Sequence, residues 1–129
     1  MLFLGLGTGL GSALLVEGVV GPMELAHLPY RNGCTYESYV GNPGLKRLGK
    51  RKWKHHVLRI VSQFKSALQT DYVVLGGGNV RLLKKLPKDV HRGQNCRAYE
   101  GGCRLWEDPR KIAARAFTLG VTRRSLEAR

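Results

Sequence analysis

The 129-residue sequence predicts an α/β domain in which helices pack against a small sheet that begins with a glycine-rich hairpin. Two short apolar runs at the amino terminus flank a glycine-rich turn, a pattern typical of a β-hairpin. From Lys50 to Leu68, apolar residues recur at intervals of three and four and predict a long helix. A further apolar run, Tyr72–Leu75, ends in three glycines and predicts a buried strand. A chain of this length forms one compact domain.

The amino-terminal strands are expected at Met1–Leu6 and Ser12–Val16, joined by the turn Gly7–Gly11. Gly18 ends the second strand, and a third element is expected from Val19 to Met23. The opening run is uncharged but lacks the basic start of a signal peptide, and it is short for a membrane span. We therefore interpret it as folded structure.

Prolines and asparagine–glycine pairs predict loops up to about residue 44, with one helical turn at 35–40. After the triple glycine, a helix is expected to begin near Asn79 and to end before Pro87. A further helix is expected at Asn95–Trp106. Residues 107–129 form a basic tail, expected to be either a loosely packed helix or disordered.

The charge is concentrated in one segment. The chain has 22 Lys and Arg against nine Asp and Glu, a formal net charge of +13. Residues 44–92 hold thirteen of the basic and two of the acidic side chains, a net of +11. This balance excludes an acidic calcium-buffer protein and indicates a polyanionic ligand.

Three cysteines, Cys34, Cys96 and Cys103, cannot all pair within one chain, and no C-x-x-C occurs. The sequence therefore predicts neither a disulfide framework nor a four-cysteine zinc site. A reduced, cytoplasmic setting is the simpler interpretation.

Two glycine-rich segments are candidate ligand sites. In Gly5–Ser12, glycines at every second position let backbone amides point into one concavity that suits an anion, with the Thr8 and Ser12 hydroxyls as further donors. A glycine-rich hairpin without a ligand is an equal alternative. The glycines at 76–78, between a strand and a helix, allow a ligand to lie against bare backbone, although tight turns use glycine for geometry as well.

Polar side chains form two further candidate groups. Glu24, His27 and Glu37 are residue types that hold sugar hydroxyls, and the alternative is a solvated surface pair. The basic segment Lys46–His56, with Trp53 between its cations, could follow a phosphate backbone. Trp53 also falls on the apolar stripe of the predicted helix, which favours a place in the core.

In this order the pieces resemble the carboxyl-terminal lobe of the ROK sugar kinases, within the actin-like, ribonuclease-H-like ATPase superfamily, and most strongly the polyphosphate glucokinase branch. Leu4–Ala13 is similar to the second phosphate loop of that family. Glu24–His27 is similar to its Glu-x-Gly-His sugar motif, with Ala26 in place of the usual glycine. The other matching segments are Tyr36–Tyr39, at its next sugar-binding glutamate; Tyr72–Asn79, at its adenosine-side strand and turn; and Asn95–Trp106, at its closing helix.

The resemblance implies three groups of site residues. The sugar-binding group is Glu24, His27 and Glu37, the phosphate-binding group is Gly7, Thr8 and Gly9, and the nucleotide-binding group is Gly76, Gly77 and Gly78. The implied reaction is phosphoryl transfer from polyphosphate or ATP to the 6-hydroxyl of glucose, with Mg²⁺ neutralising phosphate charge. A polyanionic donor would account for the excess of basic charge.

The likeness extends over residues 1–106 and departs from the family in three respects. Cys96 and Cys103 stand at helix positions where small or apolar residues are expected, and buried free cysteines are the simple interpretation. Only Cys34 stands where many members carry a zinc loop, so no zinc is expected. The first phosphate motif and the catalytic Asn-Asp of the family belong to an amino-terminal lobe without a counterpart in this sequence. No catalytic residue is therefore assigned. The chain is expected to be a glucokinase fragment that is inactive alone and pairs with the missing lobe or with another copy of itself.

Two other functions remain open from the sequence. One is a small basic nucleic-acid-binding protein, although no helix-turn-helix, zinc-finger or RNP signature is present. The other is a non-catalytic module that binds sugar or polyphosphate.

Overall fold

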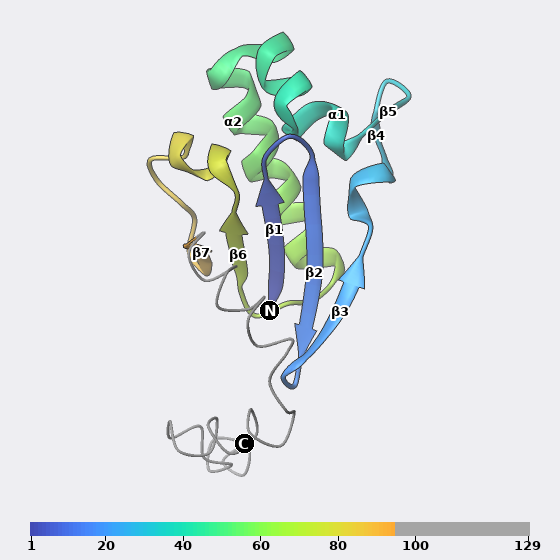
Figure 1. The fold of residues 1–129 in the computed structure, drawn as a ribbon, viewed down its shortest axis with the longest axis vertical. Helices are drawn as coiled ribbons and strands as arrows, with labels where there is room; N and C mark the ends of the chain where they lie inside the picture. The colour runs from blue at the N-terminus through green and yellow to red at the C-terminus, as the bar shows by residue number, and fades with distance from the viewer. Residues whose placement is uncertain (95–129) are drawn as a thin grey trace. The chain divides into compact units, whose positions relative to one another are not determined.

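The computed structural model describes residues 1–94. Their main feature is a five-stranded mixed sheet in the order β3-β2-β1-β6-β7 (Figure 1). β1 pairs antiparallel with β2 and parallel with β6, while β2 pairs antiparallel with β3 and β6 parallel with β7. The strands are β1 (Leu2–Leu6), β2 (Leu10–Val16), β3 (Val19–Met23), β6 (Val73–Gly76) and β7 (Val90–Arg92).

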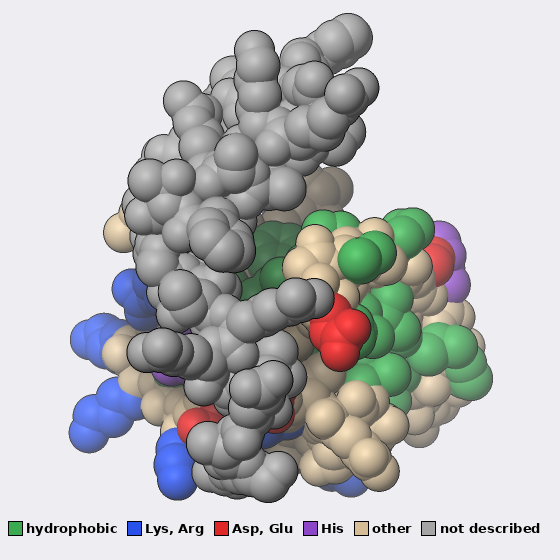
Figure 2. Space-filling model, turned by 90° about the horizontal axis from the view of Figure 1, so that it is seen from below, with side chains coloured by type: hydrophobic (Ala, Val, Ile, Leu, Met, Phe, Trp, Pro, Cys, Tyr) green, Lys and Arg blue, Asp and Glu red, His purple; other side chains and the backbone are tan. Residues whose placement is uncertain are grey.

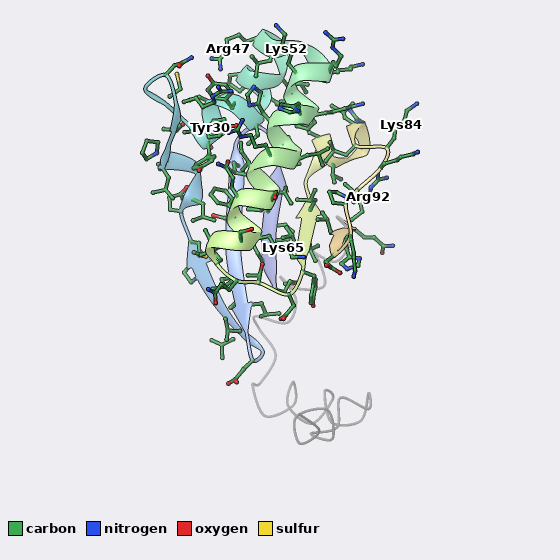
Figure 3. All side chains as sticks on the ribbon, turned by 180° about the vertical axis from the view of Figure 1, so that it is seen from behind. Tyr30, Arg47, Lys52, Lys65, Lys84 and Arg92 are labelled. Carbon is green, nitrogen blue, oxygen red and sulfur yellow. The ribbon has the colours of Figure 1, made fainter. Side chains whose placement is uncertain are left out.

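A long helix, α2 (Asn42–Ala67), covers one face of the sheet: it lies behind the strands in Figure 1 and in front of them in Figure 3. The segment between β3 and α2 carries short elements, and a 3₁₀ helix follows β6. These are η1 (Leu25–His27), β4 (Pro29–Arg31), β5 (Cys34–Thr35), α1 (Tyr36–Val40) and η2 (Gly78–Leu82). No helix among residues 1–94 is long and apolar enough to cross a bilayer.

The core lies between the sheet and α2, as the alternation along β1 requires. Leu2, Leu4 and Leu6 are almost fully buried, whereas Phe3 points to the other face and is 36% exposed. From α2, Trp53 and Ile60 reach into the same core. The predicted α/β class, with a helix packed on a small sheet, is confirmed.

The predicted hairpin, the third element, the helical turn at 35–40 and the buried strand near 72–75 are all present. The prediction of a loop at Asn42–Gly44 was wrong, because a first helical stretch begins at Asn42; the helix predicted from Lys50 follows the kink at Gly49. Proline is compatible with the first turn of a helix, where no N–H partner is lost. Gly44 is required there because a Cβ would overlap the Tyr39 carbonyl. Gly49 (φ 73°) then interrupts the helix with a kink.

The helix predicted from Asn79 to Pro87 was also wrong. The chain forms only the 3₁₀ helix η2 and then turns, with Asp89 at φ 59°, into the unpredicted edge strand β7. The short hairpin of β4 and β5 was predicted as a loop. The predicted helix at 95–106 and the tail at 107–129 lie outside the described residues.

Candidate functional site

A hollow of about 510 Å³ lies at the end of the sheet where β1 turns into β2. It unites segments that are far apart in the sequence: the glycine-rich hairpin, the turn after β3, helix α1 and the turn after β6. Its lining residues are Gly5, Gly7, Gly9, Leu10, Gly11, Glu24, His27, Glu37 and Gly77. All three predicted sugar-binding residues therefore share one hollow with two of the predicted phosphate-binding glycines.

Glu37 is placed on the hollow by helix α1. Thr35 caps this helix by accepting a hydrogen bond from the Ser38 amide at 3.4 Å. The Leu10 amide donates to Glu37 Oε2 at 3.1 Å. A Cβ on Gly9 would lie 2.9 Å from the Glu37 carboxyl carbon, so glycine is needed for this close approach. The Glu37 carboxylate thus holds the hairpin with one oxygen and lines the hollow.

Glu24 and His27 form the outer rim of the hollow. Their side chains are 68% and 72% exposed, and His27 Nδ1 lies 3.8 Å from Glu24 Oε1. Ser12 ties this rim to β2, because its hydroxyl donates to the Met23 carbonyl at 2.7 Å and accepts from the Leu25 amide at 3.1 Å. The Ser12 hydroxyl is therefore committed to the fold, and the expectation that it would donate to an anion was wrong.

The turn between β1 and β2 is closed on itself. The Gly7 amide donates to the Gly9 carbonyl at 3.1 Å, and the Thr8 carbonyl accepts from the Asn42 amide at 3.0 Å. Within residues 1–94, no hydrogen bond engages the amides of Thr8 and Gly9. Two unengaged amides at one turn can bind an anion. The Thr8 side chain is exposed and does not line the hollow.

The glycines after β6 do not act alike. Gly77 lines the hollow, with φ 86°, and a Cβ there would lie 2.8 Å from Leu6 N. A Cβ on Gly76 would lie 2.8 Å from the Phe3 ring, whereas Gly78 has open space around it. Close packing thus explains the first two glycines, and the nucleotide-binding role of the three stays a prediction.

A cluster of aromatic side chains packs at helix α1. The Tyr30 hydroxyl and His56 Nδ1 are 3.0 Å apart, and the Tyr39 ring of α1 packs edge-on against both. Burial lowers the pKa of His56, and the nearby charges of Arg31, His55 and Arg59 lower it further. The same burial raises the pKa of Tyr30. The cluster is stable with His56 neutral.

The basic segment presents its cations at the surface, but its one tryptophan is not available for stacking against a base. Trp53 is fully buried and donates through Nε1 to the Val40 carbonyl at 2.8 Å, as its place on the apolar stripe predicted. Figure 3 shows Arg47 and Lys52 near the amino-terminal end of α2, and Lys84 and Arg92 on the β7 side of the sheet. In the face seen in Figure 2, basic side chains gather on one side and hydrophobic ones on the other.

The hollow contains few side chains that could bind a metal ion. Among residues 1–94, no group of three or more His, Cys, Asp or Glu side chains could hold a metal ion. Mg²⁺ in phosphoryl transfer is usually bound by one or two carboxylates together with substrate phosphates. Mg²⁺ bound at this hollow would therefore depend on phosphate ligands in addition to what residues 1–94 supply.

Two positioning side chains were missed in the sequence. Ser12 was interpreted as an anion donor at the start of a strand, and Asn79 as the end of the adenosine-side turn and the start of a helix, so neither was expected to hold other segments in place. Asn79 donates through Nδ2 to the Gly7 carbonyl at 3.2 Å and to Asn42 Oδ1 at 2.8 Å. The one available signal was that Asn79 is a polar residue directly after three glycines, at the end of a buried strand.

No family model and no curated protein matches this sequence. Among solved structures, the chain is similar to the inorganic polyphosphate/ATP-glucomannokinase from Arthrobacter sp. strain KM, with a TM-score of 0.61 and 24% identity over 70% of this chain and 39% of that one. It also matches a ROK hexokinase from Thermus thermophilus, with a TM-score of 0.45 and 20% identity over 70% of this chain and 52% of that one. The chain thus spans only about two fifths to one half of these proteins. The first match shows that it shares its fold with part of a sugar kinase.

Proposed function

We propose that this chain is the sugar- and phosphate-binding part of a ROK-type glucokinase, with the fold of the carboxyl-terminal lobe of actin-like ATPases. In this proposal Glu24, His27 and Glu37 bind glucose hydroxyls, and the turn Gly7–Gly9 receives the phosphates of polyphosphate or ATP. Gly76–Gly78 lie toward the nucleotide. The complete enzyme would transfer a phosphoryl group to the 6-hydroxyl of glucose.

The observation that carries the proposal is the shared hollow. Two carboxylates and an imidazole, which can accept hydrogen bonds from hydroxyls or donate to them, line the same depression as Gly7 and Gly9, whose turn has two unengaged amides. Sugar and phosphate would therefore meet at one place, as a kinase requires. The open, exposed rim at Glu24 and His27 agrees with a cleft that needs a second wall.

The likeness in fold supports the same conclusion. The similar glucomannokinase is described as using inorganic polyphosphate and ATP. A polyanionic donor also suits the net charge of +11 on residues 44–92. In this proposal Mg²⁺ enters with the phosphates of the donor and neutralises part of their charge.

Glucose binding tests the sugar site. We expect glucose to bind the 129-residue chain in a calorimetric titration, and Glu24→Gln to weaken that binding roughly tenfold, since a hydrogen bond to a charged group contributes about 1.5–3 kcal/mol. Glu17→Gln is the matched control, because Glu17 is an exposed glutamate in the β2–β3 turn and does not line the hollow. Equal affinities of the two variants would contradict the proposal.

Catalysis is expected to be absent in the isolated chain. The described residues provide one wall of a cleft and no assigned general base, so a coupled assay with glucose, Mg²⁺ and either ATP or polyphosphate should detect no glucose 6-phosphate. Product formation by the purified chain would show that the fragment interpretation is wrong. Duplex DNA binding that weakens steeply with salt, without any response to glucose, would favour the nucleic-acid alternative.

A further inference from the structure

Three segments that are distant in the sequence meet at the side chain of Asn79. This residue stands in η2, and its amide nitrogen donates to the Gly7 carbonyl of the hairpin turn and to Asn42 Oδ1 at the start of α2. Both hydrogens of the amide are thereby used. Because a backbone carbonyl only accepts, the contact with Gly7 fixes which way the Asn79 amide points.

The Gly7–Gly9 turn is held in place through its carbonyl groups. The Gly7 carbonyl is held by Asn79, and the Thr8 carbonyl by the amide of Asn42 at 3.0 Å. A Cβ on Gly41 would lie 2.8 Å from the Thr8 carbonyl, so the two backbones touch at this point. The turn is therefore fixed on its carbonyl side, while the amides of Thr8 and Gly9 remain unengaged within the described residues.

The end of the same turn that lies next to the proposed sugar site is held by Glu37. Glu37 accepts from the Leu10 amide and packs on Gly9, without contact to Asn79 in any hydrogen bond among residues 1–94. Loss of the Asn79 contacts would consequently leave Glu37, Glu24 and His27 in place.

We propose that Asn79 is a positioning residue for phosphate: it holds the Gly7–Gly9 turn so that the amides of Thr8 and Gly9 point together toward the donor. The inference rests on the proposed function and adds to it a separation of the two substrates. Asn79 determines the affinity for phosphate, and the carboxylates determine the affinity for sugar. Preorganised amides bind an anion without the cost of ordering a loop.

Asn79→Leu tests this, because leucine has nearly the same size and no hydrogen-bonding group. With pyrophosphate as the probe in an NMR titration, we expect at least fivefold weaker binding to Asn79→Leu, and glucose affinity within twofold of the wild type. Asn42→Ala is the matched control. It removes the side-chain partner but leaves both the Gly7 contact and the Asn42 amide, so it should weaken pyrophosphate binding less than twofold.

The outcomes separate this inference from the function on which it rests. Unchanged pyrophosphate binding in Asn79→Leu, or an equal loss for pyrophosphate and glucose, would overturn the positioning role. A wild-type chain that does not bind pyrophosphate would overturn it as well. A wild-type chain that binds pyrophosphate but not glucose contradicts the proposed sugar site alone, and the comparison of Asn79→Leu with Asn42→Ala still decides the role of Asn79.

Discussion

The two glycine-rich turns at the hollow are similar in composition, but each contains glycine for a different physical reason. In the hairpin turn, Gly7 and Gly11 have open space where a Cβ would be, and Gly9 faces only a flexible carboxylate. In the turn after β6, Gly76 and Gly77 face an aromatic ring and the backbone of β1. The first turn leaves room for a ligand, whereas most of the second is filled by the protein itself.

The difference shows that glycine marks a close approach without indicating what approaches. A run of glycines at the end of a strand resembles a nucleotide-binding turn in sequence, yet Gly77 is required by Leu6 and by a φ of 86°. Substitutions by alanine, one turn against the other, measure this difference directly.

Gly77→Ala is expected to have the largest effect. A backbone at φ 86° and ψ 164° is almost exclusive to glycine and costs another residue about 1–3 kcal/mol, and the overlap with the Leu6 backbone adds about 1 kcal/mol, for a total of roughly 3 kcal/mol. The free energy of unfolding in urea should fall by that amount. A loss below about 1 kcal/mol would mean that this turn is as open as the hairpin.

Gly9→Ala should have an intermediate effect on stability and a clear effect on sugar binding. The added methyl group would displace the Glu37 carboxylate and break its bond to the Leu10 amide, at a cost of about 1–2 kcal/mol. Glucose affinity should fall in the same titration used for Glu24→Gln. Gly21→Ala is the control, because a Cβ there meets only the Leu14 carbonyl at 3.6 Å and Gly21 does not line the hollow; if both variants lose sugar binding equally, Glu37 is not the cause.

Acidification should lower the local stability of the β1–β2 hairpin turn before that of the turn after β6. Because the pKa of His56 is lower in the folded protein than in the unfolded chain, the unfolded chain binds a proton first as the pH falls. The contribution of neutral His56 to the free energy of unfolding is therefore complete above about pH 6.5 and declines as the pH falls toward the pKa of His56 in the folded protein. Exchange protection of the Leu10 amide, corrected for intrinsic rates, should drop more than that of Val80 between about pH 7.5 and about pH 5.5. Equal changes at both amides, or a difference that persists in His56→Gln, would refute this connection.

Gly78→Ala should have the smallest effect. Its Cβ would meet nothing within 4 Å, and its φ is not in the left-handed region, so stability should change by less than about 0.5 kcal/mol. A larger loss, measured in the same urea titration as Gly77→Ala, would show that the third glycine is also fixed by packing.

Most of the sheet and the long helix were predictable, because local signals determine them. The alternation along β1 and the three-and-four spacing around Trp53 each reflect the burial of one face. The errors occurred where distant contacts outweigh local pattern. Asn42–Gly44 was expected to be a loop because proline and glycine usually end helices, but Pro43 starts one and Gly44 fits against α1. Strand β7 forms because the edge of β6 is available for pairing.

The candidate site was predictable as a set of residue types and not as a geometry. Glu24, His27 and Glu37 were selected as groups that bind hydroxyls, and they do line one hollow, although that they bind glucose stays a prediction. Spacing could not show that Ser12 is occupied by the Met23 carbonyl, since that contact depends on the pairing of β2 with β3. Asn79 was missed for the same reason, because its partner at Gly7 is 72 residues away.

The position of β1 in the centre of the sheet has a consequence for how the molecule is made. One neighbour, β2, follows at once in the chain, while the other, β6, pairs Val73 with Leu2 and so cannot form until about seventy further residues have been synthesised after β1. Until then, the β1–β2–β3 meander of the nascent chain exposes the unpaired, leucine-rich edge of β1. Such edges attract other strands, so a chaperone, or rapid translation through α2, would be expected to raise the yield of folded protein.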